Sequence, residues 1–400
     1  MTRGVGGSTA QQELAQLRPP PRRAPPITAA DYTARLETAR AFMSGIGADA
    51  LLVGAGASLR YFTGVPWGAS ERLVCLMLPR LGRPVIVCPA FELGSLRASL
   101  ALDDAIVEVW EEDEDPHRIA AASARRAGSK LALDPGAAFA VFSGLRRADP
   151  GLDILDGAPV IDGCRRIKST AELALMSEAK AITLEAHRRA AMALAPGVLA
   201  SEVKRFIDAA HRAMGADGGS TFCAVQFGEA TAYPHGLPGD QSLGEGDLVL
   251  IDTGGQVQGY NADITRTYVF GRPTDEQRRI WDIEHEAQAA AFAAVRPGVA
   301  CEAIDGAARD VLERSSLGPD YRLPGLPHRT GHGIGLSVHE APYLVRGDRT
   351  PLQPGMCFSN EPMIVVPGRF GIRLEDHFHV TEDGAAWFTE PSPSIDAPFG

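Results

Sequence analysis

Residues 251–267 read IDTGGQVQGYNADITRT and place two aspartates on either side of a glycine-rich stretch. Asp252 closes an apolar strand pattern over 248–253, and Asp263 opens a second strand pattern over 264–269. The glycines predict a turn, and the resulting hairpin would bring both carboxylates to one end of a sheet. Carboxylates held together repel one another, and a bound cation relieves the repulsion. Since aspartate is also a common turn residue, the pair indicates a cation site only together with further ligands.

Candidates for those further ligands follow in the C-terminal third of the chain. His332 lies in Gly-His-Gly-Ile-Gly, where the glycines let backbone or a metal approach closely, and His339 follows seven residues later. Glu361 and Glu375 fall in β-rich surroundings, where an unpaired glutamate is costly to bury. Considered separately, each of these residues also has an ordinary ion-pair or structural explanation.

A pattern of two helices joined by Pro-Gly-Val occurs twice in this part of the chain. A capping box at 169–172 begins a helix that ends at 196–198, and a second box at 274–277 begins a helix that ends at 297–299. Two copies are too few for a solenoid. The pattern therefore predicts an internally duplicated domain whose halves face each other around a shared site.

The residues before this duplication form two further segments. Short β-rich runs alternate with helical stretches over 28–165, which is typical of an α/β domain. Residues 1–27 form a leader with five prolines between Pro19 and Pro26, and we expect it to be extended. Together with a second domain over 166–400, the sequence predicts a two-domain mixed α/β protein.

Composition agrees with two folded domains and excludes several classes of partner. The 400 residues exceed the ~250 to 300 at which single cores stop growing. A net charge of −11 argues against nucleic acid or an anionic membrane as partner. The apolar runs, such as 73–78, are too short for a membrane helix, and the leader lacks the apolar run of a signal peptide. Six scattered cysteines without a CxxC predict reduced thiols in a cytoplasmic protein.

The candidate ligands carry a resemblance to a known family. Their order within Asp-x-Gly, Asp-Ile-Thr-Arg-Thr, Gly-His-Gly-Ile-Gly, Glu-Pro and Arg-x-Glu-Asp resembles the pita-bread metallopeptidases, which include methionine aminopeptidase, aminopeptidase P and prolidase. Residues 58–64 and 166–169 also resemble the prolidase and creatinase branch, which has an N-terminal domain. The resemblance implies a creatinase/prolidase-like α/β domain followed by a duplicated pita-bread catalytic domain.

The resemblance also implies a centre with two divalent metal ions. Asp252 would bind one ion, Asp263 and Glu375 would bridge the pair, and His332 and Glu361 would complete the second ion's shell. Four carboxylates and one imidazole favour Mn²⁺, with Co²⁺, Fe²⁺ or Zn²⁺ as alternatives. Glu361 is also expected to carry the proton from the attacking water to the leaving nitrogen.

Further residues of the cleft are implied by the same resemblance, with a structural role as the alternative for each histidine. His235 resembles a histidine that lines the substrate cleft, and His328 resembles a second one. His339 resembles the histidine that bonds the scissile carbonyl. Arg373 is expected to orient Glu375 or to meet a substrate carboxylate.

The predicted activity is metal-dependent hydrolysis of the bond before proline in Xaa-Pro dipeptides. Some relatives carry, near the position of Tyr343, an arginine that grips the dipeptide carboxylate, so Tyr343 and a basic residue elsewhere become the substrate-binding candidates. The alternatives are an aminopeptidase P that acts on longer Xaa-Pro peptides, a lyase, and a metal-free binding module. We expect a cytoplasmic homodimer whose partner is a small proline-containing peptide, with no nucleic acid and no membrane.

Overall fold

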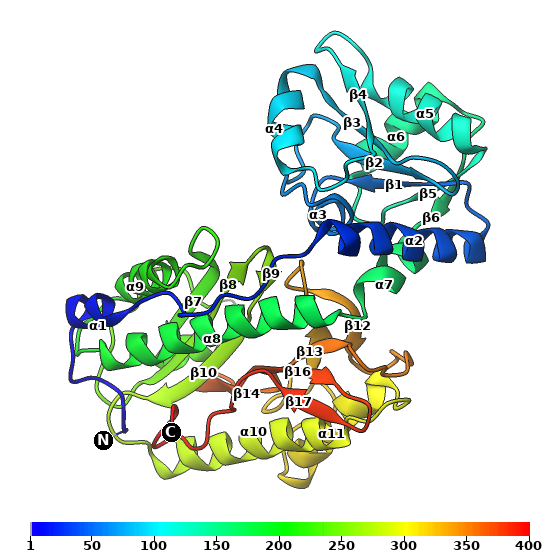
Figure 1. Ribbon diagram of the computed structural model, residues 1–400. Helices are drawn as coiled ribbons and strands as arrows, with labels where there is room; N and C mark the ends of the chain where they lie inside the picture. Colours follow the sequence, from blue (N-terminus) through cyan, green and yellow to red (C-terminus); the bar gives the residue numbers. More distant parts are fainter. Residues whose placement is uncertain (1, 235) are drawn as a thin grey trace. The chain divides into compact units, whose positions relative to one another are not determined.

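The computed structural model describes residues 2–234 and 236–400, and it divides into two compact units (Figure 1). The smaller unit is Ile27–Arg165, and the larger unit combines the chain up to Pro26 with Arg166–Gly400. The mixture of helices and sheets in both units confirms the predicted mixed α/β class. In the part of the chain that the structure describes, no helix combines the length and apolar character needed to cross a membrane.

The smaller unit is built on a six-stranded sheet in the order β4-β3-β2-β1-β5-β6. Strand β2 is antiparallel to both neighbours, and the other pairs are parallel. Alternate residues of β2 and β3, such as Cys75 and Val87, pack with Ala120 of α5 and Leu145 of α6 in one apolar core. The strands are β1 (Ala50–Gly54), β2 (Cys75–Pro79), β3 (Val85–Pro89), β4 (Ile106–Trp110), β5 (Lys130–Leu133) and β6 (Asp153–Asp156). The helices are α2 (Ala29–Ile46), α3 (Ala57–Thr63), α4 (Leu93–Ser99), α5 (Pro116–Ala127), α6 (Phe139–Ala148) and α7 (Ala158–Arg165), with a 3-10 turn at Ala90–Glu92.

The prediction of an extended leader is wrong for its first half, which contains helix α1 (Ala10–Gln16). Thr9 caps this helix, and AQQELAQ consists of good helix formers, so local propensity favours it. The helix packs on α8 and α9 of the larger unit, where buried Glu13 pairs with Arg189 at 3.0 Å. Residues 17–28, which hold the prolines, contain neither helix nor strand.

The larger unit consists of two halves, each with a helix pair and antiparallel strands. The helix pairs are α8 (Thr170–Met192) with α9 (Ala200–Ala213) and α10 (Asp275–Ala294) with α11 (Cys301–Arg314). The first half contains β7 (Ser220–Phe227), β8 (Leu248–Val257), β9 (Tyr260–Asn261) and β10 (Ile264–Val269), with a 3-10 turn at Gly228–Ala232. The second half contains β11 (Gly331–Gly333), β12 (Glu340–Leu344), β13 (Cys357–Asn360), β14 (Met363–Val366), β15 (Phe370–Arg373), β16 (Asp376–Val380) and β17 (Ala385–Trp387). Helices α8 and α9 pack on the first group of strands, and α10 and α11 pack on the second (Figure 1).

The predicted duplication is visible in matching hydrogen bonds at the two Pro-Gly-Val turns. In the first half, Gly197 N donates to Leu243 O at 2.8 Å and Leu243 N donates to Val198 O at 2.9 Å. In the second half, Gly298 N donates to Leu352 O and Leu352 N donates to Val299 O, both at 2.8 Å. Both predicted capping boxes are also formed, at the start of α8 and of α10. The same local chemistry therefore builds both halves.

The hairpin that carries the two aspartates turns at Gly259, the last glycine of the stretch, and not at Gly254 and Gly255. Asp252 lies in the middle of β8, which continues through Gly254 to Val257, and the chain turns at residues 258–259. A Cβ on Gly254 would lie 1.8 Å from Ala262 O, so this glycine permits close backbone packing and does not form the turn. The close approach brings residue 263 beside β8.

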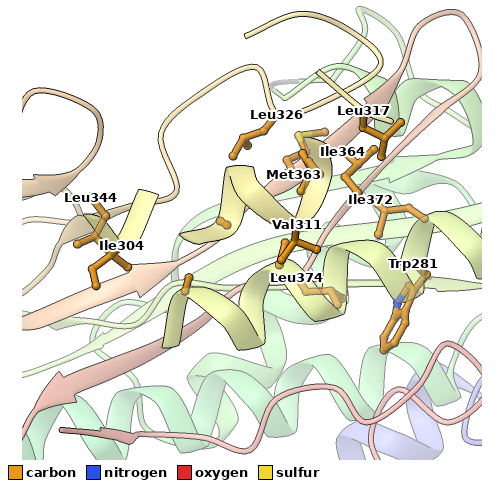
Figure 2. Close-up of a cluster of buried hydrophobic side chains, with 14 of the residues drawn as sticks. Trp281, Ile304, Val311, Leu317, Leu326, Leu344, Met363, Ile364, Ile372 and Leu374 are labelled. Carbon is orange, nitrogen blue, oxygen red and sulfur yellow. The ribbon is translucent and has the colours of Figure 1, made fainter. Parts of the chain in front are cut away.

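A buried apolar cluster supports the strands of the second half (Figure 2). Trp281 from α10 and Val311 from α11 contribute to it, together with Met363, Ile372 and Leu374 from the strand region. Because side chains alternate along an extended chain, burial of Leu374 on the core side turns its neighbour at 375 toward the opposite side. The core thereby fixes the direction of that carboxylate.

A buried ion pair joins the two halves next to the same residue. Arg266 on β10 pairs with Asp376 on β16 at 2.7 Å, and both side chains are almost fully buried. Arg266 also donates to the carbonyl of Glu375 at 3.0 Å. Loss of either charge would leave the other unpaired in the interior.

Asp376→Ala should therefore lower the free energy of unfolding of the larger unit by ~3 to 5 kcal/mol, because Arg266 would remain buried without a counter-charge. Urea unfolding followed by tryptophan fluorescence measures this change. Asp310→Ala, at an exposed position on α11, is the matched control and should leave the transition in place. Equal midpoints for the two variants would contradict the role given to the ion pair.

Candidate metal centre

The five predicted ligands meet in one cavity of the larger unit. The cavity has a volume of about 910 Å³, and part of its wall is apolar, with Phe222, Pro327 and Val338. Its lining includes Asp252, Asp263, His332, Glu361 and Glu375. Asp252 lies in β8 and His332 in β11. The other three lie next to strands: Asp263 directly before β10, Glu361 directly after β13, and Glu375 directly before β16. Both halves therefore contribute ligands to one site.

Thr265 connects the halves at this cavity. It lies opposite Asp252 in the β8–β10 register, and its backbone forms a bridge to Glu375. Thr265 Oγ1 donates to Glu375 Oε2 at 2.7 Å, and Glu375 N donates to Thr265 O at 3.1 Å. One residue of the first half thus positions a carboxylate of the second half beside Asp252 and Asp263.

The imidazole of His332 is oriented by its own backbone surroundings. Its Nδ1 lies 3.0 Å from Gly333 O, so the ring N–H points there and Nε2 is left as the ligand atom. Nε2 lies 3.1 Å from Glu361 Oε1 and 3.8 Å from Asp263 Oδ2. A Cβ on the preceding Gly331 would lie 2.1 Å from Ser359 O, so glycine is needed for this packing.

The carboxylates are crowded in a buried place. Burial raises the pKa of Asp263 and of Glu375 well above the ordinary values, and neighbouring carboxylates raise both further. Burial also acts to raise the pKa of Glu361, but His332, His328 and Arg373 together outweigh it, and the net pKa is lowered. The crowding therefore disfavours the fully ionised cluster unless positive charge is added.

Unpartnered oxygen atoms show that the donor set fits a divalent cation. Oδ1 of Asp252, Oδ1 of Asp263 and Oε1 of Glu375 are buried without a hydrogen-bond partner among residues 2–234 and 236–400. Donor atoms of His332, Glu361 and Glu375 lie within 4.8 Å of one another. Carboxylate oxygens with one or two imidazoles suit divalent metals such as Mn²⁺, Fe²⁺, Co²⁺ and Zn²⁺.

Arg373 has a different partner from the one predicted. Its guanidinium forms an ion pair with Asp252, and its Nε donates to Thr265 Oγ1 at 3.1 Å. Thr265 Oγ1 in turn donates to Glu375 Oε2 at 2.7 Å, so Arg373 reaches Glu375 through Thr265, and its role in orienting that carboxylate stays a prediction. Arg373 is buried and committed to Asp252, so its charge balances the cluster itself.

The predicted cleft histidines take separate places. His328 lines the cavity, with Nδ1 donating to Arg329 O at 2.7 Å. His339 also lines it and packs edge-on against His332 with ring centroids 4.3 Å apart. Partial burial and neighbouring positive groups lower the pKa of His339 to about 4, so its ring is neutral at pH 7. His235 lies outside the described residues.

Tyr343 and a residue that the sequence analysis missed form one unit. The guanidinium of Arg329 lies over the Tyr343 ring, 4.6 Å from its centroid, and Arg329 lines the cavity while Tyr343 supports it from behind. A direct contact of Tyr343 with substrate stays a prediction. Arg329 could have been noticed from its place between His328 and His332 in HRTGH. A second missed residue, His377, lies two positions after Glu375 on the same strand face.

Comparisons with known proteins agree with this geometry and with the family resemblance. The model of metallopeptidase family M24 matches residues 174–382, and the model of the Creatinase/Prolidase N-terminal domain matches residues 35–167. The probable dipeptidase PepE of Mycobacterium tuberculosis is 38% identical over 360 residues, which cover 88% of this chain and 93% of that relative. The structure of dipeptidase PepE from Mycobacterium ulcerans has a TM-score of 0.84 at 36% identity and covers 92% of this chain and 97% of its own. The prolidase from Thermococcus sibiricus has a TM-score of 0.82 at 30% identity and covers 90% of this chain and 97% of its own.

Asp263→Asn should bind fewer divalent ions than the unchanged protein, because a neutral amide cannot balance a second cation between the carboxylates. Elemental analysis after loading with Mn²⁺ and removal of free metal measures the content. Asp282→Asn, at an exposed position on α10, is the control and should keep full content. Full metal content in Asp263→Asn would exclude a bridging role for Asp263.

Proposed function

The chain belongs to metallopeptidase family M24, and we propose that it hydrolyses the peptide bond preceding proline in Xaa-Pro dipeptides. The observation that carries the proposal is the meeting of four carboxylates and His332 in one cavity, with His339 beside them. Relatives named dipeptidase and prolidase, at 30 to 38% identity, support this substrate class. The predicted cytoplasmic location and homodimer stay predictions.

Two divalent ions are proposed for this cavity. Asp252, Asp263 and Glu375 would hold the first ion, and Asp263, Glu375, His332 and Glu361 would hold the second. Mn²⁺ is the proposed metal because most donors are oxygens, and Co²⁺, Fe²⁺ and Zn²⁺ are the alternatives. When bound, such ions supply Lewis acidity toward the scissile carbonyl and lower the pKa of water.

Glu361 is the proposed acid and base. Its carboxylate faces the cavity with 13% of the side chain exposed, so it can touch both the site and the substrate. Ser359 Oγ donates to its Oε1 at 3.1 Å and leaves Oε2 available. Glu361 would accept the proton of the attacking water through its carboxylate and pass it to the leaving nitrogen of proline.

His339 is the proposed donor to the scissile carbonyl. Its ring is open to the cavity and is held in place by its edge-on contact with His332. A neutral imidazole N–H aimed at the carbonyl oxygen forms a stronger hydrogen bond as negative charge develops on that oxygen. It therefore stabilises the transition state more than the bound peptide.

Arg329 is the proposed partner of the dipeptide carboxylate. Arg373 is excluded from this role because it is buried against Asp252, whereas Arg329 has no ion-pair partner in the described part of the chain. The Tyr343 ring beneath it restricts the guanidinium, so little flexibility is lost when a carboxylate binds. An aminopeptidase P acting on longer chains would not need this cation, which makes Arg329 the residue that separates the two activities.

His339→Ala should lower kcat by ~10²- to 10³-fold, because one donor to the developing oxyanion is lost. Metal content and KM should change little, since His339 is not among the proposed ligands. Steady-state hydrolysis of an Xaa-Pro dipeptide, with elemental analysis of each variant, tests this expectation. A variant with normal kcat would show that His339 has only a structural role.

Arg329→Gln should lower kcat/KM for an Xaa-Pro dipeptide about tenfold or more, the value of a charge-assisted hydrogen bond of ~1.5 to 3 kcal/mol. Unchanged protein should lose a similar factor when the dipeptide is C-terminally amidated, and the variant should not distinguish acid from amide. Product analysis with matched Xaa-Pro, Xaa-Pro amide and Xaa-Pro-Yaa peptides measures these ratios. Arg346→Gln, which removes an exposed arginine paired with Asp320, is the control.

Equal hydrolysis of the acid and the amide by the unchanged protein, with Xaa-Pro-Yaa hydrolysed better than either, would refute the dipeptidase proposal. Aminopeptidase P would then take its place. Failure of all three peptides in the metal-loaded protein would refute both activities.

A further inference from the structure

His377 lies beside the carboxylate cluster, although it is not one of the five ligands described above. It belongs to β16, two residues after Glu375, so the two side chains share one face of the extended chain. The intervening Asp376 points the other way and pairs with Arg266. The His377 ring is fully buried, with 0% of the residue exposed.

Both ring nitrogens of His377 lack a hydrogen-bond partner within the described residues. A buried imidazole without any partner is costly, and native proteins rarely leave one in that state. Other buried histidines of the larger unit find partners. His211 contacts Thr183 Oγ1 and Ser220 Oγ at 3.0 and 2.8 Å, and His187 contacts Ile264 O at 3.0 Å. His377 differs from these histidines because neither of its ring nitrogens has a hydrogen-bond partner in the described chain.

Carboxylate oxygens of the cluster lie close to the His377 ring. Nε2 lies 3.8 Å from Glu375 Oε1, which is too far for a hydrogen bond. Glu375 Oε1 and Asp263 Oδ1 are themselves buried and unpartnered in the chain as described. One donor atom each from Asp263, Glu375 and His377 lie within 4.8 Å of one another. Ligand atoms that sit about 2.0 to 2.2 Å from one ion are separated by about 3 to 4 Å, so this spacing is close to that of a coordination shell.

The neighbouring ammonium group of Lys180 does not explain why the His377 ring nitrogens lack hydrogen-bond partners. Lys180 Nζ donates to Asn261 O at 3.0 Å and lies 4.6 Å from the centroid of the Phe388 ring. Lys180 is therefore occupied, and an ammonium group could not serve as acceptor for a ring N–H in any case. The orphaned atoms around His377 are instead those that a cation would satisfy.

We propose that His377 is a further metal ligand, which joins Asp263 and Glu375 at one ion through Nε2. The inference rests on the metal centre of the proposed function and adds a second imidazole to it. Imidazole favours later divalent metals such as Zn²⁺ more than Mn²⁺, which prefers oxygen. With the His377 imidazole, the centre would therefore bind Zn²⁺ more tightly than the same centre without it.

The test is metal binding by the metal-stripped full chain, measured by calorimetric titration with Zn²⁺ and, separately, with Mn²⁺. His377→Leu keeps the volume of the buried ring and removes the nitrogen. We expect its Zn²⁺ affinity at one site to fall about tenfold or more, and its Mn²⁺ affinity to fall less. His379→Leu is the matched control, because His379 lies on the same strand, is not fully buried and belongs to none of the groups of close donor atoms among the described residues.

His379→Leu should bind both metals within twofold of the unchanged protein. Unchanged Zn²⁺ affinity in His377→Leu would overturn the inference and leave the five-ligand centre intact. Absence of any metal binding by the unchanged protein would overturn the proposed function as well, so the two failures are distinguishable.

A direct readout covers the case in which His377→Leu does not fold. Ring-nitrogen NMR of ¹⁵N-histidine-labelled protein, with and without Zn²⁺, should show a metal-shifted imidazole that disappears in His377→Gln. A spectrum in which the His377 ring does not move when Zn²⁺ is added to the unchanged protein would refute the ligand role.

Discussion

Repulsion among the buried carboxylates of the cavity is the constraint on which the rest of the larger unit depends. Asp252, Asp263, Glu361 and Glu375 face one another, and burial strengthens their interaction because little water screens it. Arg373 supplies positive charge to the cluster through its ion pair with Asp252. Each of the four acids must be held in position against this repulsion, and a bound cation or protonation would relieve the cost of burying them together.

Much of the surrounding structure can be understood as the means of holding these acids. The apolar core behind Leu374 turns Glu375 toward the cavity, and Thr265 fastens its carboxylate from the other half. The Arg266–Asp376 pair closes the same junction one residue further along. Because the two halves repeat one plan, strands of both halves reach the shared cavity, and each half contributes some of the predicted ligands.

The sequence could predict features whose causes are local. Capping boxes, the Pro-Gly-Val turns and the alternation of strands and helices follow from neighbouring residues, and the structure contains them as predicted. The grouping of the five predicted ligands could be inferred only from the family resemblance. The number of residues between Asp252 and Glu375 does not indicate how close the two side chains lie in the folded protein. Helix α1 was missed although its local signals are present: Thr9 and the helix formers after it predict a helix. The prolines that follow led to the prediction of an extended leader.

The remaining errors concern contacts between distant segments. Gly254 has the residue type of a turn, but the approach of Ala262 is what requires it, and no local pattern reveals that approach. The contacts of Arg373 depend on Thr265, which accepts a hydrogen bond from Arg373 and donates one to Glu375. This arrangement exists only when the two halves are folded together. His377 is inconspicuous in sequence because its importance comes from four unpartnered atoms that belong to three residues.

The two arginines that line the cavity, Arg373 and Arg329, differ in how their charges are used. Arg373 is buried, and its charge is used by Asp252, so a substrate carboxylate could bind it only by breaking an internal ion pair. Arg329 rests on an aromatic ring, which orients the guanidinium through its π face but does not neutralise it. Its charge therefore remains directed at the cavity, next to His328 and His339. Arg329 carries its charge into the cavity without an ion-pair partner among the described residues, so it is the proposed site for an anionic group of a bound peptide.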